Sequence, residues 1–229
     1  MEKIVVLTGA GMSAESGIRT FRDMGGLWKE YDIMEVASPS GWQKHPDVVL
    51  EFYNQRRKQL LACQPNEGHF ILAELEKYFD LHIITQNVDD LHERAGSSNI
   101  LHLHGELRKV RSTGDSDLIY DLKGWELKLG DTCEKGYQLR PHIVWFGEPV
   151  PNIYKAEEIC RTADIFIIVG TSLNVYPAAG LMYFIPSEIP IYYIDPKPAS
   201  VPEYINIIPQ KASSGLKTVK DILLKKKQK

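Results

Sequence analysis

Glycine, amide, carboxylate and imidazole side chains in a few short segments supply most of the chemistry available to this chain. Gly9-x-Gly11-x-x-Ala14 directly follows an apolar run at residues 4–7. A strand that leads into G-x-G-x-x-G/A fits a dinucleotide fingerprint, because glycine lets the backbone turn tightly and approach a pyrophosphate. An ordinary Rossmann domain also has a ribose-binding acid about 20 residues further on, whereas the sequence of residues 24–30 here is typical of a loop. The pattern favours a nucleotide site and disfavours an ordinary dehydrogenase.

A second polar segment closes a buried run at residues 81–86. Gln86, Asn87 and Asp89 bring two amides and a carboxylate to the place where parallel sheets bind ligands, the carboxyl ends of their strands. A purely local role is also open, with Asn87 as a helix N-cap and Asp89 in the first turn.

The third segment is Leu101-His102-Leu103-His104-Gly105. Strand alternation places His102 and His104 on one face, and His104 at the edge is the better general base near neutral pH. A hydrogen-bonded structural histidine is the alternative, and a metal site lacks acidic or thiol partners at ligand spacing. Gly170-Thr171-Ser172 follows another apolar run and suits either phosphate and ribose or a turn and helix cap.

These segments need elements to position them. Continuous apolar runs indicate strands buried on both faces, and therefore a parallel sheet covered by helices. We expect strands at residues 4–8, 81–86, 100–103, 142–146, 165–170 and 189–194. Helical patterns alternate with them at residues 47–62, 67–78, 89–95, 155–162 and from about 214 onward. The alternation predicts an α/β fold with a doubly wound, Rossmann-like parallel sheet.

Two segments interrupt this alternation and predict a smaller lobe formed by two insertions. Residues 24–66 contain a loop and a long helix without a strand, and residues 108–141 are polar and glycine-rich, with strand character only around 118–122. We therefore expect one domain over residues 1–229. Its large lobe comprises residues 1–23, 80–107 and 142–229, and its small lobe residues 24–79 and 108–141.

Composition sets limits on partners. The chain is 43% apolar and 25% charged with a formal net charge of −3, which gives no reason to expect nucleic-acid binding. No apolar stretch reaches the ~18 residues of a membrane span, and no signal-peptide pattern is visible. Three cysteines make a poor disulfide framework and suit a reducing cytosol. We expect a cytoplasmic monomer that binds neither membranes nor nucleic acid.

The motifs, taken in order, resemble those of the sirtuins, which are NAD-dependent protein-lysine deacylases. The resemblance covers roughly residues 3–225 and rests on GAGMSAESGI from Gly9, Thr20-Phe21-Arg22, Gln86-Asn87-Val88-Asp89, His104-Gly105, Gly170-Thr171-Ser172 and Pro177-Ala178-Ala179. It implies that NAD is a co-substrate, that the products are free lysine, nicotinamide and O-acyl-ADP-ribose, and that acylated-lysine proteins or peptides are the partners.

The resemblance also implies residue roles. His104 becomes the general base on the ribose hydroxyls, and Asn87 and Asp89 join it as catalytic residues. Val144, Phe146 and Gly147 resemble the segment that pairs with a substrate peptide as an added strand. The implied NAD-binding set is Gly9, Ala10, Gly11, Ser13, Ala14, Phe21, Arg22, Gln86, Asn87, Asp89, Gly170, Thr171, Ser172, Asp195, Pro196, Lys197 and Ala212.

Acyl preference depends on Tyr53 and Arg56, which are three residues apart on the predicted helix. A guanidinium beside a phenol can bind both oxygens of a carboxylate. A Tyr-x-x-Arg pair at this place resembles the sirtuin subgroup that removes succinyl and malonyl groups, with deacetylation as a side activity. The alternative is a solvated Arg-Arg-Lys face with a half-buried Tyr53.

One feature departs from the family. Most sirtuins hold a structural zinc with two Cys-x-x-Cys pairs, whereas here residues 110–115 lack the first pair and only Cys133 remains of the second. One thiolate cannot build such a site, so we expect no zinc. Packing by Trp125, Leu127, Leu129 and Tyr137 is then expected to hold the small lobe. Two other functions stay open: a catalytically silent NAD or ADP-ribose-binding module, and mono-ADP-ribosyl transfer.

Overall fold

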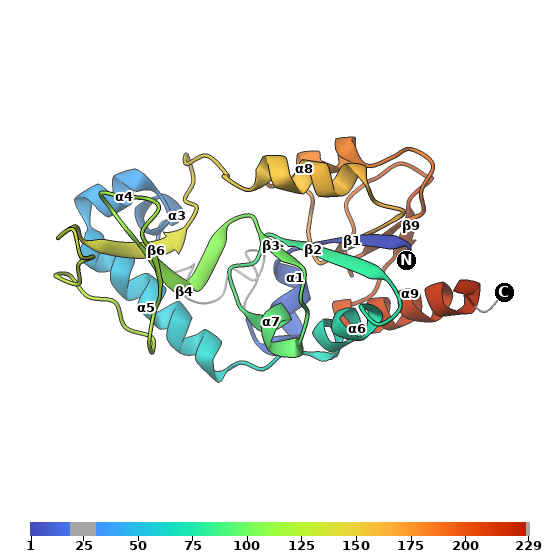
Figure 1. Cartoon of the computed structure of the whole chain (residues 1–229), viewed down its shortest axis with the longest axis horizontal. Helices are drawn as coiled ribbons and strands as arrows, with labels where there is room; N and C mark the ends of the chain where they lie inside the picture. The colour runs from blue at the N-terminus through green and yellow to red at the C-terminus, as the bar shows by residue number, and fades with distance from the viewer. Residues whose placement is uncertain (19–30, 228–229) are drawn as a thin grey trace.

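The computed structural model describes residues 1–18 and 31–227, which form a large and a small lobe placed end to end (Figure 1). Within these residues the large lobe has a parallel sheet of six strands in the order β3-β2-β1-β7-β8-β9. The strands are β1 (Lys3–Thr8), β2 (Asp80–Thr85), β3 (Ile100–His102), β7 (Ile165–Val169), β8 (Ile191–Ile194) and β9 (Asn206–Ile208). The expected doubly wound α/β fold is confirmed.

The apolar strands are buried because helices cover both faces of this sheet. Ile4 and Val6 pack in one core with α6 (Glu67–Leu75) and α9 (Ala212–Lys227). Val5 and Leu7 point the other way, into a core with α8 (Ile153–Arg161) and the 3₁₀ helix η2 (Ala178–Phe184). Alternate residues of one strand thus fill two cores, which is why the sequence shows an unbroken apolar run.

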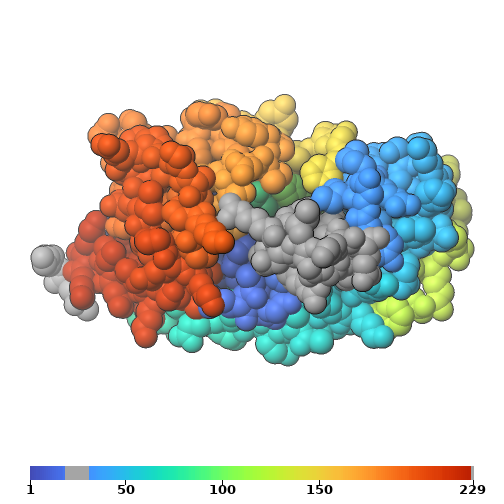
Figure 2. Space-filling model, turned by 180° about the vertical axis from the view of Figure 1, so that it is seen from behind, coloured from blue at the N-terminus to red at the C-terminus, as the bar shows by residue number. Residues whose placement is uncertain are grey.

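The small lobe combines helices with a second sheet. Its helices are α3 (Ile33–Val36), α4 (Pro39–Lys44) and α5 (Pro46–Ala62). An antiparallel sheet in the order β5-β4-β6 is built from β4 (Gly105–Ser112), β5 (Ile119–Asp121) and β6 (Leu139–Ile143). Phe52, Tyr53 and Trp145 lie in the core between helices and sheet. Figure 2 shows the light-blue helices of this lobe at the opposite end of the molecule from the orange and red C-terminal segments.

Three features of the fold differ from the expectations. The strand expected at residues 142–146 is β6, which ends at Ile143 and pairs with β4 rather than joining the parallel sheet. The sixth parallel strand is β9, a three-residue edge strand too short and too exposed to show a pattern. Helix α6, expected in the small lobe, packs against α9 in the core of the large lobe, because its apolar face matches the sheet.

The core expected for the second insertion was also wrong. Leu127 is buried beside Leu50 and Val110, but Trp125, Leu129 and Tyr137 are 36%, 54% and 48% exposed. The insertion is fixed largely by polar contacts instead. Cys133 Sγ lies 3.4 Å from Ser112 Oγ, and Lys135 pairs with Asp115 at 2.7 Å. None of the helices in the described ranges is long and apolar enough to cross a membrane.

Candidate functional site

The carboxyl ends of β1, β2 and β7 bring the predicted segments together. Thr8 lies beside Thr85 on one side and Val169 on the other, so Gly9, Gln86 and Gly170 begin neighbouring loops. Gln86 Nε2 crosses to Thr171 Oγ1 at 3.1 Å. The sheet therefore gathers three of the sequence motifs at one edge, where doubly wound folds bind ligands.

The glycine turn packs directly against the loop after β7. Gly11 N donates to Gly170 O at 2.8 Å, and a Cβ on Gly11 would come within 2.6 Å of Gly170 Cα. Gly170 itself has a φ of +62°, and its own Cβ would meet Met12 N at 2.4 Å. Only glycine fits at both positions. The turn continues as one helical turn, α1 (Ala10–Ser13), and the 3₁₀ turn η1 (Ala14–Ser16).

Asn87, Ser13 and Asp89 form a buried network under this turn. Asn87 Nδ2 donates to Gly9 O at 3.0 Å and to Ser13 Oγ at 3.1 Å. Ser13 Oγ donates to Asp89 Oδ2 at 2.9 Å. Burial raises the pKa of Asp89, and the Ser13 hydroxyl offsets part of that rise. Helix α7 (Leu91–Ala95) has Asp90 as its N-cap, so Asn87 is not a helix cap, although Asp89 Oδ1 does accept from Leu91 N.

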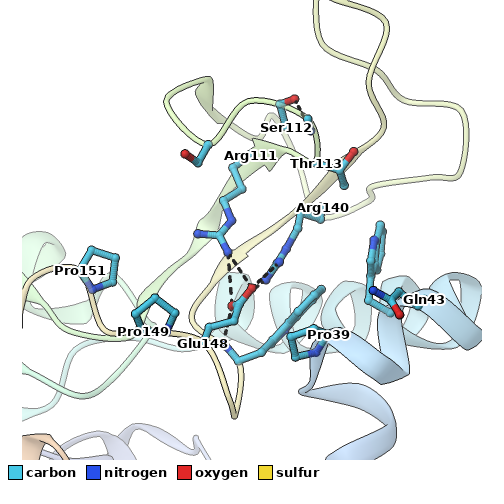
Figure 3. Close-up of a pocket in the computed structure, with 13 residues that line it drawn as sticks. Pro39, Gln43, Arg111, Ser112, Thr113, Arg140, Glu148, Pro149 and Pro151 are labelled. Carbon is cyan, nitrogen blue, oxygen red and sulfur yellow. Dashed lines mark hydrogen bonds and ion pairs between the residues drawn. The ribbon is translucent and has the colours of Figure 1, made fainter.

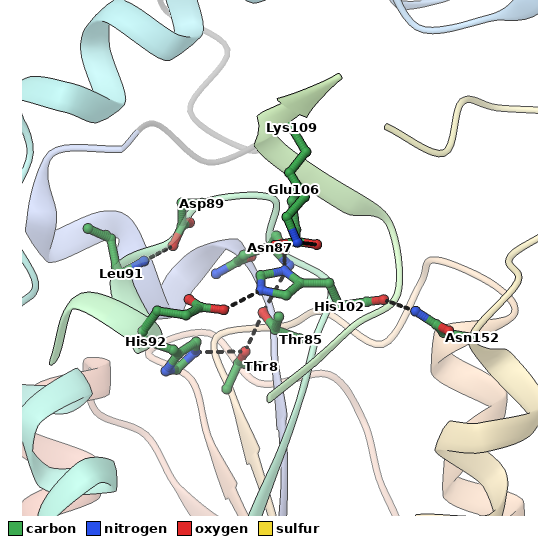
Figure 4. Close-up of polar contacts among 11 residues, drawn as sticks. Thr8, Thr85, Asn87, Asp89, Leu91, His92, His102, Glu106, Lys109 and Asn152 are labelled. Atoms are coloured by element: carbon green, nitrogen blue, oxygen red, sulfur yellow. Dashed lines mark hydrogen bonds and ion pairs between the residues drawn. The ribbon is translucent and has the colours of Figure 1, made fainter. Parts of the chain in front are cut away.

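His102 ends β3 and His104 follows it, and both reach back to the loop after β2, as Figure 4 shows for His102. His104 Nδ1 contacts Gln86 O at 3.0 Å, and His102 Nδ1 contacts Asn87 O at 3.0 Å. Because a carbonyl only accepts, Nδ1 of His104 carries the proton and Nε2 keeps its lone pair in the neutral ring. Burial lowers the pKa of His104, with only partial compensation from this hydrogen bond. A neutral His104 with a basic Nε2 is the form that a general base requires.

Residues implied for the adenosine side lie across β7 and β8. Val169 and Ile194 are register partners, so Thr171 and Asp195 leave neighbouring strand ends. Asp195 Oδ1 accepts from Lys197 N at 2.8 Å, which shapes the loop through Pro196. Ala212 begins α9, and Ser213 N donates to Glu15 Oε2 at 3.0 Å, which ties this helix to the glycine turn.

Tyr53 and Arg56 share a face of α5, as the spacing predicts. The Arg56 guanidinium carbon lies 5.9 Å from the centre of the Tyr53 ring, and burial lowers the pKa of Arg56 while Tyr53 and Asp89 oppose that shift. Asp89, which belongs to the buried network of Ser13, Asn87 and Asp89 at the strand ends (the strand-end network), is thus one of the charges that act on Arg56. Arg57 is fully buried and donates from Nε to Trp125 O at 2.7 Å. The alternative of a solvated Arg-Arg-Lys face therefore fails for these two arginines.

Trp145, Arg140 and Glu148 support this face, although the sequence analysis did not single them out. Trp145 Nε1 donates to Tyr53 Oη at 3.0 Å, and the Arg140 guanidinium carbon lies 3.3 Å from the centre of the Trp145 ring. Glu148 binds Arg140 at 2.7 Å, Arg111 at 3.2 Å and Trp145 N at 2.8 Å. These residues line a surface hollow of about 700 Å³ (Figure 3). The hollow lies on the supporting side of Trp145 and contains none of the predicted site residues.

The segment from Val144 to Gly147 connects both lobes. Val144 N donates to His104 O at 3.0 Å, and Phe146 N donates to Ala37 O at 2.9 Å. Phe146 is 45% exposed, and Gly147 has a φ of +91°. Phe21 and Arg22 lie outside the described residues. Among the residues that are described, no three His, Cys, Asp or Glu side chains cluster in a way that could hold a metal ion.

Comparison with known proteins identifies this arrangement. The model of the Sir2 family matches residues 9–177. The chain belongs to the Sir2 family. A relative from Bacteroides thetaiotaomicron, described as an NAD-dependent protein deacylase, is 55% identical in an alignment of 231 residues that covers 98% of this chain and 99% of the relative.

Solved Sir2 structures share the whole fold. A Sir2 homologue in complex with NAD is 39% identical, with a TM-score of 0.89 over 97% of this chain and 90% of the other. A Sir2 homologue bound to ADP-ribose is 38% identical, with a TM-score of 0.90 over 99% and 93%. The large lobe with its strand-end network is thus the Sir2 large lobe, and the small antiparallel sheet is part of the same fold.

Proposed function

We propose that this Sir2 chain removes acyl groups from protein lysines with NAD as co-substrate, and that it prefers succinyl- and malonyl-lysine over acetyl-lysine. The names of its relatives and the NAD and ADP-ribose complexes of its structural neighbours support the reaction class. The single observation that carries the proposal is the set of contacts joining Gly9, Ser13, Asn87 and Asp89 next to a neutral His104.

The residues present fit NAD. Because Gly11 and Gly170 have no Cβ, the glycine turn packs directly against the loop after β7, which holds its backbone at the strand ends where doubly wound folds bind a pyrophosphate. Gln86, Asn87 and Asp89 offer amides and a carboxylate for the nicotinamide and its ribose. Thr171, Ser172 and Lys197 offer hydroxyl and ammonium groups for the adenosine half. When bound, NAD supplies a nicotinamide–ribose bond whose cleavage leaves a ribose carbon that the acyl oxygen of the substrate captures.

His104 moves the proton in this proposal. Its Nδ1–H is fixed on Gln86 O, so Nε2 is the atom that accepts a proton from a ribose hydroxyl. That deprotonated oxygen closes on the acyl carbon, and water then completes release of free lysine and O-acyl-ADP-ribose. The general base must be neutral, so activity falls as the pH drops through the pKa of His104, which burial holds below its usual value.

Tyr53 and Arg56 are the proposed carboxylate clamp. Trp145 donates to the Tyr53 oxygen, so the phenol keeps its own proton available for a carboxylate. Arg56 is half-buried, which strengthens a charge-assisted bond because fewer waters compete. Such a bond contributes about 1.5–3 kcal/mol, which corresponds to roughly 10- to 150-fold in kcat/KM.

The test is an acyl panel on one peptide sequence. Acetyl-, malonyl- and succinyl-lysine versions are incubated with NAD, and peptide mass and nicotinamide release are followed together. R56M is expected to lower kcat/KM on the succinyl peptide by about 10- to 100-fold and to leave acetyl removal within about twofold. K58M, an exposed cation two residues along α5, is the matched control and should change neither rate. Absence of NAD-dependent acyl loss from every peptide would refute the enzyme, and equal loss of both activities in R56M would refute the clamp.

A further inference from the structure

His102 and His104 make the same kind of contact, each with the backbone carbonyl of one of two adjacent residues. Nδ1 of His104 donates to Gln86 O and Nδ1 of His102 donates to Asn87 O, both at 3.0 Å. The two rings differ at Nε2. In His104 the described part of the chain offers Nε2 no hydrogen-bond partner, whereas His102 Nε2 lies 2.8 Å from Glu93 Oε1 (Figure 4). His104 keeps a lone pair for chemistry, whereas His102 uses both nitrogens to join α7 to the loop after β2, residues 86–90, which we call the catalytic loop.

The proton count follows from those acceptors. A carbonyl oxygen and a carboxylate both accept, so both ring nitrogens of His102 must donate, and only an imidazolium has two N–H groups. We infer that His102 is a positioning residue, charged at neutral pH, that holds the Asn87 backbone against Glu93, and that loss of its proton sets the alkaline limit of the reaction. This inference rests on the two contacts of the ring, on the 9% exposure of the His102 side chain and on its hydrogen bond to the Asn87 carbonyl.

The charges around His102 agree with this assignment. Burial alone would lower the pKa of His102, but the Glu93 hydrogen bond and the charges of Glu93 and Glu106 outweigh it, so the pKa is raised. Glu93 has a lowered pKa for the reciprocal reason, since the His102 contact outweighs its own burial. Lys109 binds Glu106 at 2.9 Å and partly screens it. Asp89 faces His102 on the catalytic loop, and His92 on α7 is kept neutral by burial, which holds its pKa well below the usual value.

His102 acts through Asn87 and not on substrate. The Asn87 side chain is fixed by Gly9 and Ser13, its backbone N–H donates to Thr85 Oγ1 at 3.0 Å, and its carbonyl is held by His102. Asn152 Nδ2 donates to His102 O at 2.8 Å and fixes the other side of the strand. When His102 loses a proton, either the Asn87 carbonyl or the Glu93 carboxylate loses its donor, and the loop is released. The two histidines thus bracket a pH window, with His104 losing function in acid and His102 in base.

The inference deepens the proposed deacylation, and its first test does not depend on activity. Histidine-selective ¹⁵N NMR of the full chain reports the protonation of each ring nitrogen, with H102Q and H104A used to assign the signals. We expect both His102 nitrogens to be protonated at pH 7, and His104 to be neutral with Nδ1 protonated. A neutral His102 at pH 7 would overturn the inference whether or not the chain is a deacylase. A charged His102 in a chain without deacylase activity would leave the anchor standing and remove the proposed function.

The second test is the pH profile of kcat. E93Q keeps an acceptor for Nε2 but removes the charge, so the alkaline limb should move about one pH unit toward neutrality while the acid limb stays. H102Q can make only one of the two contacts, and we expect kcat to fall about 10-fold with the alkaline limb abolished and KM for the acyl peptide unchanged. D80N is the matched control. It removes a second His–acid pair, His82 with Asp80 at 3.0 Å, which lies on β2 away from the site, and it should leave both limbs in place. An alkaline limb unmoved in E93Q would contradict the inference.

Discussion

Ser13→Ala tests how much of the site depends on one hydroxyl. Ser13 is 1% exposed, and its Oγ accepts from Asn87 Nδ2 and donates to Asp89 Oδ2. Alanine removes both contacts and leaves a buried amide and a buried carboxylate without that partner. Loss of a hydrogen bond to a charged group costs about 1.5–3 kcal/mol and loss of a neutral one about 0.5–1.5, so we expect a decrease of about 2–4 kcal/mol in the free energy of unfolding.

Thermal and urea unfolding measure this decrease. For a chain of this size each kcal/mol moves Tm by about 2–4 °C, so a drop of about 4–16 °C is expected. Ser97→Ala is the matched control, because Ser97 is also a buried serine, yet its hydroxyl finds no hydrogen-bond partner in the described part of the chain. That variant should be close to wild type or slightly more stable, since an unsatisfied polar atom is removed. Equal losses in the two variants would refute the reasoning.

The same variant has a kinetic signature. Without the Ser13 hydrogen bond, which lowers the pKa of Asp89, burial acts with less opposition and the pKa of Asp89 rises further. We expect kcat/KM for NAD to fall about 30-fold at pH 7, which corresponds to a loss of about 2 kcal/mol in transition-state stabilisation. The deficit should widen as the pH is lowered. A deficit that does not change with pH would show that Asp89 is not the group affected.

Three further predictions concern the frame of the site. Gly170→Ala forces a Cβ onto Met12 N at a φ of +62°, so the free energy of unfolding should fall by about 2 kcal/mol or more in a urea titration. Gly147→Ala has open space around the new Cβ and a φ of +91°, so it should lose only about 1 kcal/mol in the same titration. Burial favours a raised pKa for Glu148, but the Arg140 contact, the Trp145 N–H and the charges of Arg140 and Arg111 keep it below its usual value. Its stabilisation is therefore present above the ordinary carboxyl pKa and lost as the pH falls through the lowered one, and the gap of about 1–3 kcal/mol between wild type and E148Q at neutral pH should close over that fall. Cys133→Ser should cost less than about 1 kcal/mol, because the thiol makes one weak contact to Ser112 at 3.4 Å, and chelators should leave Tm unchanged; elemental analysis that finds one metal per chain would contradict this.

The sequence predicted the large lobe well because its strands are buried on both faces. Five of the six expected strands have counterparts in the parallel sheet within two residues at each end. The misses follow from weak patterns. Strand β9 has three residues and little burial, and β4 has only two apolar residues, Leu107 and Val110, which are three positions apart and do not give the alternation of a strand. The partner of a short strand is a tertiary property, so the sequence did not reveal that residues 139–143 join β4.

The candidate site was predictable where residues act through their own type and place. Asn87, Asp89 and His104 occupy strand ends, and any parallel sheet brings such ends together. The supporting residues were not predictable, because their roles depend on distant partners. Trp145 matters through Tyr53, 92 positions away in the sequence, and Glu15 through Ser213, 198 positions away. His102 differs again, since its alternation with His104 was visible but its link to Glu93 needed the turn of α7.

The separation of the two lobes explains how acyl choice and chemistry can vary independently. The strand-end network rests on the large sheet, whereas the Tyr53–Trp145–Glu148 chain rests on α5 and the small sheet. The lobes meet at backbone contacts, such as Leu107 N to Val88 O at 2.7 Å and Val144 N to His104 O at 3.0 Å, and at side-chain contacts between α7 and α5, such as Arg94 Nη2 to Cys63 O at 2.6 Å. The side chains of Tyr53 and Trp145 hydrogen-bond to each other and not to these lobe contacts, so we expect a change confined to that pair to alter the clamp without moving the His104 ring. Trp145→Phe keeps an aromatic ring at this position and removes the indole donor to Tyr53. KM for a succinyl peptide should therefore rise, while the pH profile of kcat keeps the wild-type acid limb. A shifted acid limb in that variant would mean that the contacts between the lobes couple the clamp to His104.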